Sequence, residues 1–269
     1  LISLFLLPFF KSIKKFAKYS GEWDDYKELD FSYRFQIFLI SKRLFFNGPL
    51  FVYSKKNYDN NIIPSFTSSL TKIEIENADL ATQNKNIHDY FTIMFAGRLS
   101  YNKGVDILIR SIKYFTTINE MKFKLVICGD GEEEVKLKKL AIELDVNNHI
   151  EWKGWINSNE LYNIYKQAHF ICQPTRMQES WGKSVQEGLA FRCIPLCSNI
   201  GGLKNQLKDQ PFLLFEPGNY KILAEKLDIL IKDKNKYTNI KNWSSNKYNI
   251  KSIEEYKNHI FANIKKYYN

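Results

Sequence analysis

From Tyr90 to Ile231 the sequence alternates between short apolar runs and longer amphipathic stretches, and this alternation constrains the fold more than any other feature. The apolar runs have the length and composition of buried strands, and the amphipathic stretches have helical periodicity. Strands that alternate with helices form a parallel sheet with right-handed crossovers, so the predicted class is α/β. The predicted strands are residues 90–96, 123–128, 149–152, 169–172, 194–197 and 212–215.

The same reasoning predicts helices at residues 105–118, 132–144, 161–167 and 220–231, and another helix that begins at Gly182. Asn157 or Ser158 is expected to cap the third of these, because short polar side chains satisfy free amides at helix starts. Residues 232–251 are predicted to form a polar connector, followed by a last helix at 253–268. Before residue 90 the pattern is weaker, and it predicts a helix within residues 1–18, strands at 16–19, 49–53 and 61–64, and a helix at 31–46.

The loop after the first strong strand contains two cations, Arg98 and Lys103, between Gly97 and Gly104. Arginine binds phosphate oxygens in bidentate fashion, and lysine adds a point charge. Ligands of a parallel sheet bind at the carboxyl ends of its strands, which is where this loop lies. The loop is therefore a candidate phosphate-binding site, although two cations on one loop are also typical of a solvated surface.

Two carboxylates lie eight residues apart around the predicted helix start at Gly182. Glu179 falls on the entering loop and Glu187 falls inside the helix. Ionised carboxylates only accept hydrogen bonds, so the pair suits a ligand that carries many hydroxyl groups. The alternative is that both acids merely compensate the helix dipole.

Other motifs are weaker. Gly129-Asp130-Gly131 lacks the third glycine of the dinucleotide fingerprint, so a tight turn is the preferred interpretation. Gly201 and Gly202 are interpreted as a turn whose backbone N–H groups are free for an anion or a sugar. The sequence contains no Ser-His-Asp arrangement, no P-loop and no Asp-x-Asp motif.

The net charge of +10 makes nucleic acid, an anionic membrane surface or a phosphorylated ligand candidate partners. Four cysteines without zinc-site spacing indicate reduced thiols and no metal. The apolar run at residues 1–10 is too short to span a bilayer. Because the first residue is not Met, we expect the chain to begin within a longer protein.

In their order along the chain these motifs resemble those of one family. Residues 90–231 resemble the C-terminal, donor-binding domain of the family 4 retaining glycosyltransferases (glycosyl transferases group 1), which have the GT-B fold of two Rossmann-like domains. The resemblance is carried by Phe95 to Leu99 with Lys103 and Gly104, Gly129 to Gly131, Trp152 to Gly154, Pro174 and Thr175, Glu179 to Gly182, Glu187 to Ala190, Pro195, and Gly201 to Leu203.

The resemblance implies a role for each candidate residue. Arg98 and Lys103 would hold the diphosphate of a nucleotide sugar, with help from the helix that starts at Gly182. Glu187 would bind the ribose, and Glu179 would lie beside the transferred sugar. Glu179, Arg98 and Lys103 would thus form the catalytic set. The other donor-binding residues that it implies are Gly97, Gly154, Trp155, Ser180, Trp181, Lys183, Gly201 and Gly202.

The resemblance also implies an α/β chain of GT-B type with parallel sheets in two Rossmann-like domains. Residues 1–89 would form a truncated, acceptor-side N-terminal domain, residues 90–245 the donor-binding domain, and residues 246–269 a helix that packs back on the N-terminal domain. The implied activity is metal-independent retaining transfer of a hexosyl unit without a cofactor. The donor would be UDP-, GDP- or ADP-linked, and the acceptor a glycan or a lipid-linked glycan.

The implied setting is polysaccharide or lipopolysaccharide synthesis in the cytoplasm, with peripheral contact at an anionic membrane face. Two other hypotheses stay open at this point. One is a catalytically inactive fragment that binds nucleotide sugars, because part of the acceptor domain is expected to be absent. The other is a basic nucleic-acid-binding protein, although no specific nucleic-acid motif supports it.

Overall fold

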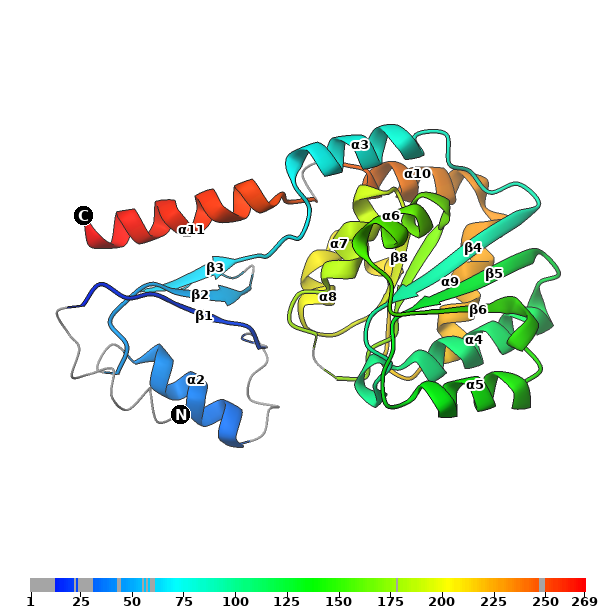
Figure 1. Ribbon diagram of the computed structural model, residues 1–269, viewed down its shortest axis with the longest axis horizontal. Coiled ribbons are helices and arrows are strands. Elements are labelled where there is room, and N and C mark those ends of the chain that lie inside the picture. The colour runs from blue at the N-terminus through cyan, green and yellow to red at the C-terminus, as the bar shows by residue number, and fades with distance from the viewer. Residues whose placement is uncertain are drawn as a thin grey trace.

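The computed structural model describes residues 13–21, 23, 31–42, 45–54, 56, 58, 61–177, 179–246 and 250–269. They form two lobes, each built around a parallel sheet (Figure 1). Most of the helix expected within residues 1–18 lies outside the described residues.

The N-terminal lobe has a sheet of three parallel strands in the order β1-β2-β3. Its elements are β1 (Ala17–Tyr19), β2 (Leu50–Tyr53), β3 (Ile62–Ser65) and the helix α2 (Phe31–Ser41). Every residue of β2 is buried, as is usual for the central strand of a parallel sheet. The last helix, α11 (Ile253–Tyr268), leaves the C-terminal lobe and packs on this sheet (Figure 1). The ring of His259 lies 6.0 Å from that of Phe51 and 5.4 Å from that of Phe66.

The C-terminal lobe has a sheet of six parallel strands in the order β6-β5-β4-β7-β8-β9. The chain builds outward from β4 to β6, then returns to the centre and builds outward again from β7 to β9. Two parallel strands at such a reversal open a crevice at their carboxyl ends, and here the crevice lies between β4 and β7. The strands are β4 (Tyr90–Ala96), β5 (Lys122–Cys128), β6 (Ile150–Gly154), β7 (Phe170–Gln173), β8 (Ile194–Ser198) and β9 (Leu214–Phe215).

Helices cover both faces of this sheet (Figure 1). One face carries α4 (Val105–Ile118), α5 (Glu134–Glu143) and α9 (Tyr220–Lys232). The other carries α6 (Ser158–Gln167), α7 (Lys183–Ala190) and α8 (Gly201–Gln206). Between sheet and helices the rings of Phe115, Phe123 and Phe170 all lie within 5.7 Å of the ring of Phe91. Full burial of one such side chain stabilises the fold by roughly 1.5–3 kcal/mol.

Among the described residues, two helices besides the short α8 were not predicted. The first is α3 (Lys72–Thr82), whose N-terminus carries a capping box between Thr71 and Glu74. The second is α10 (Lys234–Ser244), which occupies the stretch predicted to be a polar connector. It forms because Tyr237 and Ile240 are buried in the core of the C-terminal lobe. Packing of a few apolar residues outweighs a weakly helical composition.

Three further elements differ from the prediction. The helix α2 ends at Ser41 and not at residue 46. Gly201 and Gly202 are the first residues of α8 and not a turn. The predicted strand at 212–215 is a short 3-10 turn at Pro211–Leu213 followed by β9. The core of the C-terminal lobe also includes Leu70, Ile75 and Ala78, which lie between β3 and β4 in the chain.

Lys85 fixes the ends of α6 and α7 relative to each other. Its ammonium group donates to the carbonyl oxygens of Tyr165 (3.2 Å), Ala168 (2.6 Å) and Phe191. Carbonyl groups at helix C-termini carry a partial negative charge, so a cation stabilises them. This contact therefore helps to set the position of α7, which carries Glu187.

Candidate functional site

The predicted site residues follow β4 and β7, the two strands that flank the crevice. Gly97 and Arg98 come directly after β4, and Lys103 ends a short 3-10 turn at Tyr101–Lys103. Glu179 to Gly182 follow β7 and lead into α7, where Gly182 is the N-cap residue. Parallel pairing of β4 with β7 brings both loops to the same edge of the sheet.

A cleft of about 410 Å³ opens between these loops and the N-terminal lobe. Its lining includes nine of the predicted residues: Gly97, Arg98, Lys103, Glu179, Ser180, Trp181, Gly182, Lys183 and Glu187. The N-terminal lobe contributes Tyr53 and Thr67. The ring of Tyr53 stacks on that of Trp181, with centroids 5.5 Å apart, so the lobes are in contact beside the cleft.

Lys103 and Glu179 form an ion pair inside the cleft. Their side chains are only 29% and 17% exposed, so water screens the pair less than it would on an open surface. The pair neutralises both groups while no ligand is bound. A ligand with more than one negative charge can draw the lysine away from the carboxylate.

Arg98 lies at the mouth of the cleft and is 72% exposed. Its guanidinium pairs with Glu132 at 3.1 Å across the loop that follows β5. The two predicted phosphate ligands, Arg98 and Lys103, therefore line one cleft but have different acidic partners. The exposed pair is worth little to stability, so Arg98 can turn toward a ligand at small cost.

Glu187 lies in α7, is partly buried and lines the cleft. Its carboxylate accepts hydrogen bonds from the hydroxyl groups of Ser69 at 2.5 Å and Tyr165 at 3.1 Å. Burial raises the pKa of Glu187, and these two hydrogen bonds only partly oppose that rise. A buried carboxyl group with a perturbed pKa is typical of a functional site.

Ser69 and Tyr165 were not predicted. Tyr165 is the one buried residue among those of α6, and a tyrosine on the inner face of a helix normally signals only core packing. Ser69 lies in the segment ahead of α3, 118 residues from Glu187, and no local pattern marks it.

Trp155 and Gly154 lie at the end of β6, beside a second cleft of about 750 Å³. This cleft shares Gly97 and Arg98 with the first, and Trp155 lines it with 74% of its surface exposed. Gly154 lines neither cleft, and its carbonyl accepts from the backbone N–H of Gly129 at 2.7 Å. The flat, exposed indole of Trp155 is suited to stacking on a planar ring.

Gly201 and Gly202 do not line the clefts, and the N–H of Gly202 is not free for a ligand. It donates to the carbonyl of Glu179 at 2.7 Å. A Cβ atom on Gly202 would lie 2.3 Å from the carbonyl oxygen of Ser180. Gly202 therefore supports the backbone of the Glu179 loop, whereas the donor-binding role expected of Gly201 stays a prediction.

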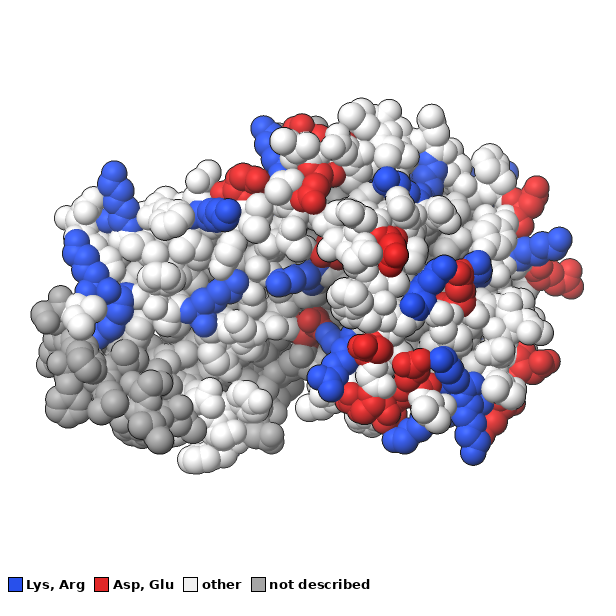
Figure 2. Space-filling model, in the orientation of Figure 1, with Lys and Arg blue, Asp and Glu red and all other residues white. Residues whose placement is uncertain are grey.

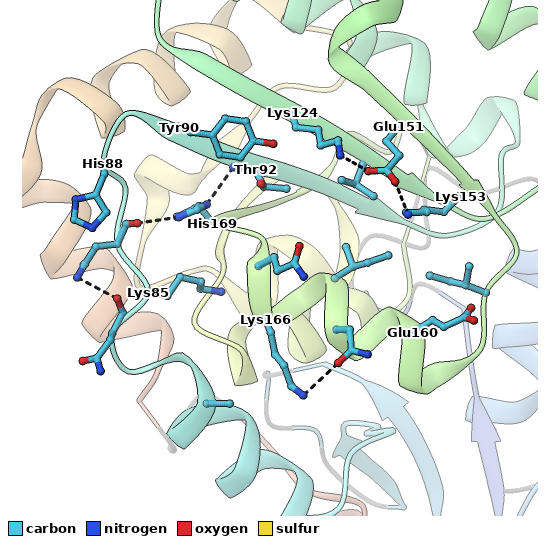
Figure 3. Close-up of a pocket in the computed structure, with 18 of the residues that line it drawn as sticks. Lys85, His88, Tyr90, Thr92, Lys124, Glu151, Lys153, Glu160, Lys166 and His169 are labelled. Atoms are coloured by element: carbon cyan, nitrogen blue, oxygen red, sulfur yellow. Dashed lines mark hydrogen bonds and ion pairs between the residues drawn. The ribbon is translucent and has the colours of Figure 1, made fainter.

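A larger groove, of about 1040 Å³, lies elsewhere, between β4, β5 and β6 and the helices α3 and α6 (Figure 3). Three of its ionisable groups are paired, since Glu151 pairs with Lys124 at 2.6 Å and with Lys153. His169 accepts from the N–H of Thr92 at 3.1 Å, and burial lowers its pKa to about 4, so it is neutral at pH 7. None of the predicted site residues lines this groove, and we place the candidate site in the smaller cleft.

The charges of the C-terminal lobe alternate in sign on the face that Figure 2 shows. A nucleic-acid-binding domain typically has a continuous basic surface, which the C-terminal lobe does not show on this face (Figure 2). All four cysteines are buried and none forms a disulfide. Among the described residues, His, Cys, Asp and Glu side chains do not gather in threes where they could hold a metal ion. Across the same described ranges, every helix is too short or too polar to cross a bilayer.

Known proteins that are similar to this chain include several glycosyltransferases. An uncharacterized glycosyltransferase of Methanocaldococcus jannaschii is 31% identical over 118 residues, which are 44% of this chain and 30% of that protein. The lipopolysaccharide 1,2-N-acetylglucosaminetransferase of Salmonella typhimurium is 25% identical over 169 residues, which are 59% of this chain and 44% of that enzyme. The matched segments thus span less than half of either relative.

Among solved structures, Anabaena HepE in complex with UDP and glucose superposes with a TM-score of 0.73 at 13% identity. The superposition covers 94% of this chain and 72% of HepE. It confirms the GT-B fold, with parallel sheets in both lobes. The family described as Glycosyl transferases group 1 matches residues 77–247, well over half of the chain. The chain therefore belongs to the group 1 glycosyltransferases.

Proposed function

We propose that this chain is the donor-binding part of a retaining glycosyltransferase, which moves a sugar from a nucleoside diphosphate to a glycan or a lipid-linked acceptor. The observation that carries the proposal is the cleft at the β4–β7 crevice. There Arg98, Lys103 and the N-terminus of α7 face the same space as Glu179 and Glu187. Cations and a helix N-terminus suit a diphosphate, and carboxylates suit the hydroxyl groups of a ribose and a sugar.

Each residue then has one task. Lys103 and Arg98 bind the diphosphate and stabilise the charge that develops on it as the bond to the sugar breaks. Glu187 accepts hydrogen bonds from the ribose, and Glu179 orients the transferred sugar. Trp155 borders the base. The positive charge in this scheme comes from the chain itself, so we propose that transfer needs no metal.

In the transfer step, the bond between the anomeric carbon and the phosphate oxygen breaks while the acceptor oxygen attacks from the same face. The acceptor proton passes to the departing phosphate oxygen, which becomes more basic as the bond lengthens. Atoms and charge balance without a protein nucleophile, and the anomeric configuration is retained. The names of the relatives support acceptors of the lipopolysaccharide or cell-surface polysaccharide class.

Replacing Arg98 and Lys103 together by alanine tests the proposal. Each hydrogen bond to a charged group contributes about 1.5–3 kcal/mol, so affinity for the bound nucleoside diphosphate should fall at least about 100-fold. UDP, GDP and ADP are compared by calorimetry. A matched control replaces Arg110 and Lys113, two cations that line a small pocket on α4 away from the cleft.

Affinity that is unchanged by the double replacement would contradict the assignment of the cleft. So would a wild-type protein that binds none of the three nucleotides. Nuclear magnetic resonance of the product distinguishes the stereochemistry, and an inverted anomeric centre would exclude the retaining step. Binding without any transfer would instead favour the inactive nucleotide-sugar-binding protein.

A further inference from the structure

The loop after β7 holds the loop after β4 through one arginine that lines neither cleft. Arg176 donates to both carboxylate oxygens of Asp106, at 2.6 and 2.5 Å. Asp106 lies in the first turn of α4, directly after the Lys103 loop. The two side chains are 22% and 28% exposed, so the pair is partly withdrawn from water. A bidentate pair of this kind fixes orientation as well as distance.

The same guanidinium also contacts the turn that contains Lys103. Its carbon lies 4.5 Å from the centre of the Tyr101 ring, and Nη1 donates to the Tyr101 carbonyl at 3.2 Å. Arginine stacks on an aromatic ring more readily than lysine does, because its charged group is planar.

The backbone of the Arg176 segment adds contacts from the same side. The N–H of Arg176 and the hydroxyl of Thr175 both donate to the carbonyl of Asn102, at 2.8 and 2.7 Å. Gly104 has a positive φ of 65°, and a Cβ atom there would lie 2.1 Å from the carbonyl oxygen of Pro174. Residues 101–104 are therefore packed against residues 174–176 with no room for displacement toward them.

Lys103 is in the middle of this packed turn, and Glu179, its ion-pair partner, lies three residues beyond Arg176. The lysine side chain is long and flexible, so its ammonium is held near one point only if the backbone from which it extends is fixed. We propose that Arg176 is a positioning residue, which holds the 101–104 turn through Asp106 and Tyr101 so that the Lys103 ammonium stays at the diphosphate position. The binding of a diphosphate by Lys103 rests on the proposed function, whereas the fixing of the turn by Arg176 does not.

Hydrogen exchange tests the fixing of the turn without any ligand. The amides of Lys103 and Gly104 donate to the carbonyls of Ser100 and Tyr101, so they report on this turn. In Arg176→Ala their exchange should accelerate at least about tenfold, which corresponds to roughly 1.4 kcal/mol of lost local stability.

The matched control is Arg192→Ala. Arg192 pairs with Asp79 at 2.8 Å, with side chains 16% and 20% exposed, and lines neither cleft. It should leave exchange at Lys103 and Gly104 unchanged. Equal exchange in the wild type and in Arg176→Ala would overturn the proposal, and so would equal acceleration in both variants.

A double-mutant cycle with UDP, or with whichever of UDP, GDP and ADP binds, tests the link to Lys103. If Arg176 acts through Lys103, Arg176→Ala should weaken binding about tenfold in the wild type but hardly at all in the Lys103→Ala background. Arg176→Lys should restore only part of the affinity, since lysine cannot bind Asp106 in bidentate fashion. Additive losses would overturn the proposal. If no nucleotide binds the wild type, the proposed function fails, and hydrogen exchange still decides the role of Arg176.

Discussion

Replacing Glu187 by glutamine removes a negative charge from the lining of the cleft while preserving the volume of the side chain. The carboxylate accepts from Ser69 and Tyr165 in the free protein, at 2.5 and 3.1 Å. In the proposed complex it accepts from the ribose as well. A hydrogen bond to a charged acceptor contributes about 1.5–3 kcal/mol, so its loss should raise the Kd for a nucleoside diphosphate about 10- to 150-fold.

Calorimetry with UDP, GDP and ADP measures this change, and its pH dependence adds a second readout. Burial raises the pKa of Glu187 above its ordinary value of 4.5. As the pH falls through the raised pKa, the carboxylate takes up a proton and loses one acceptor site and its charge. As the pH is lowered, wild-type affinity should therefore begin to decline at a higher pH than it would if Glu187 had the ordinary pKa of an exposed glutamate. The Glu187→Gln variant should lack this decline.

Glu179→Gln is the matched comparison, since it makes the same chemical change at the other carboxylate. Glu179 is proposed to face the transferred sugar, so its replacement should lower turnover. It also frees Lys103 from its ion pair, so affinity for UDP should stay equal or rise. Equal losses of UDP affinity in both variants would refute the division of roles between the two acids.

Two further predictions concern stability. Gly104→Ala should lower the free energy of unfolding by at least about 2 kcal/mol in urea titrations, because a left-handed backbone and a clash with Pro174 add together. Gly218→Ala, at a φ of 85° with nothing within 4 Å, should cost only about 1 kcal/mol, and equal costs would contradict the clash. His169 has its pKa lowered to about 4 from 6.5, so its stabilising contribution is present above pH 6.5 and is lost as the pH falls toward 4. The loss amounts to roughly 3 kcal/mol and should be absent in His169→Gln; parallel pH profiles for the two proteins would contradict this.

The sequence predicts the C-terminal lobe well because its strands and helices differ sharply in periodicity. The helix at 105–118 and the last helix at 253–268 have the predicted bounds, since each has a regular apolar stripe. The helix α3 was missed although Thr71 and Glu74 form the pattern of a capping box. The helix α10 could not be inferred, because its stability comes from the contact of Tyr237 and Ile240 with a distant core.

For the candidate site too, one part could be predicted from the sequence and another part could not. Parallel topology brings the loops after β4 and β7 together, so a sequence that reveals the strands also indicates where a cleft can open. Which side chains contact one another depends instead on how segments that are far apart in the sequence pack together. The bond from Ser69 to Glu187 and the use of the Gly202 N–H by Glu179 depend on how segments more than 20 residues apart meet, which periodicity does not encode.

The chain passes between the lobes twice, and the two passages are joined. One leads to α3 at Thr71 and the other to α11 at Ser252, and each ends in a capping box. The N–H of Ile253 donates to the carbonyl of Leu70 at 2.8 Å, and that of Lys72 donates to Glu254 at 3.0 Å. The two passages are therefore hydrogen-bonded to each other and form one connection between the lobes. Because Ser69 lies next to this connection, a change in the angle between the lobes would move the Ser69–Glu187 contact less than it would move more distant parts of the cleft.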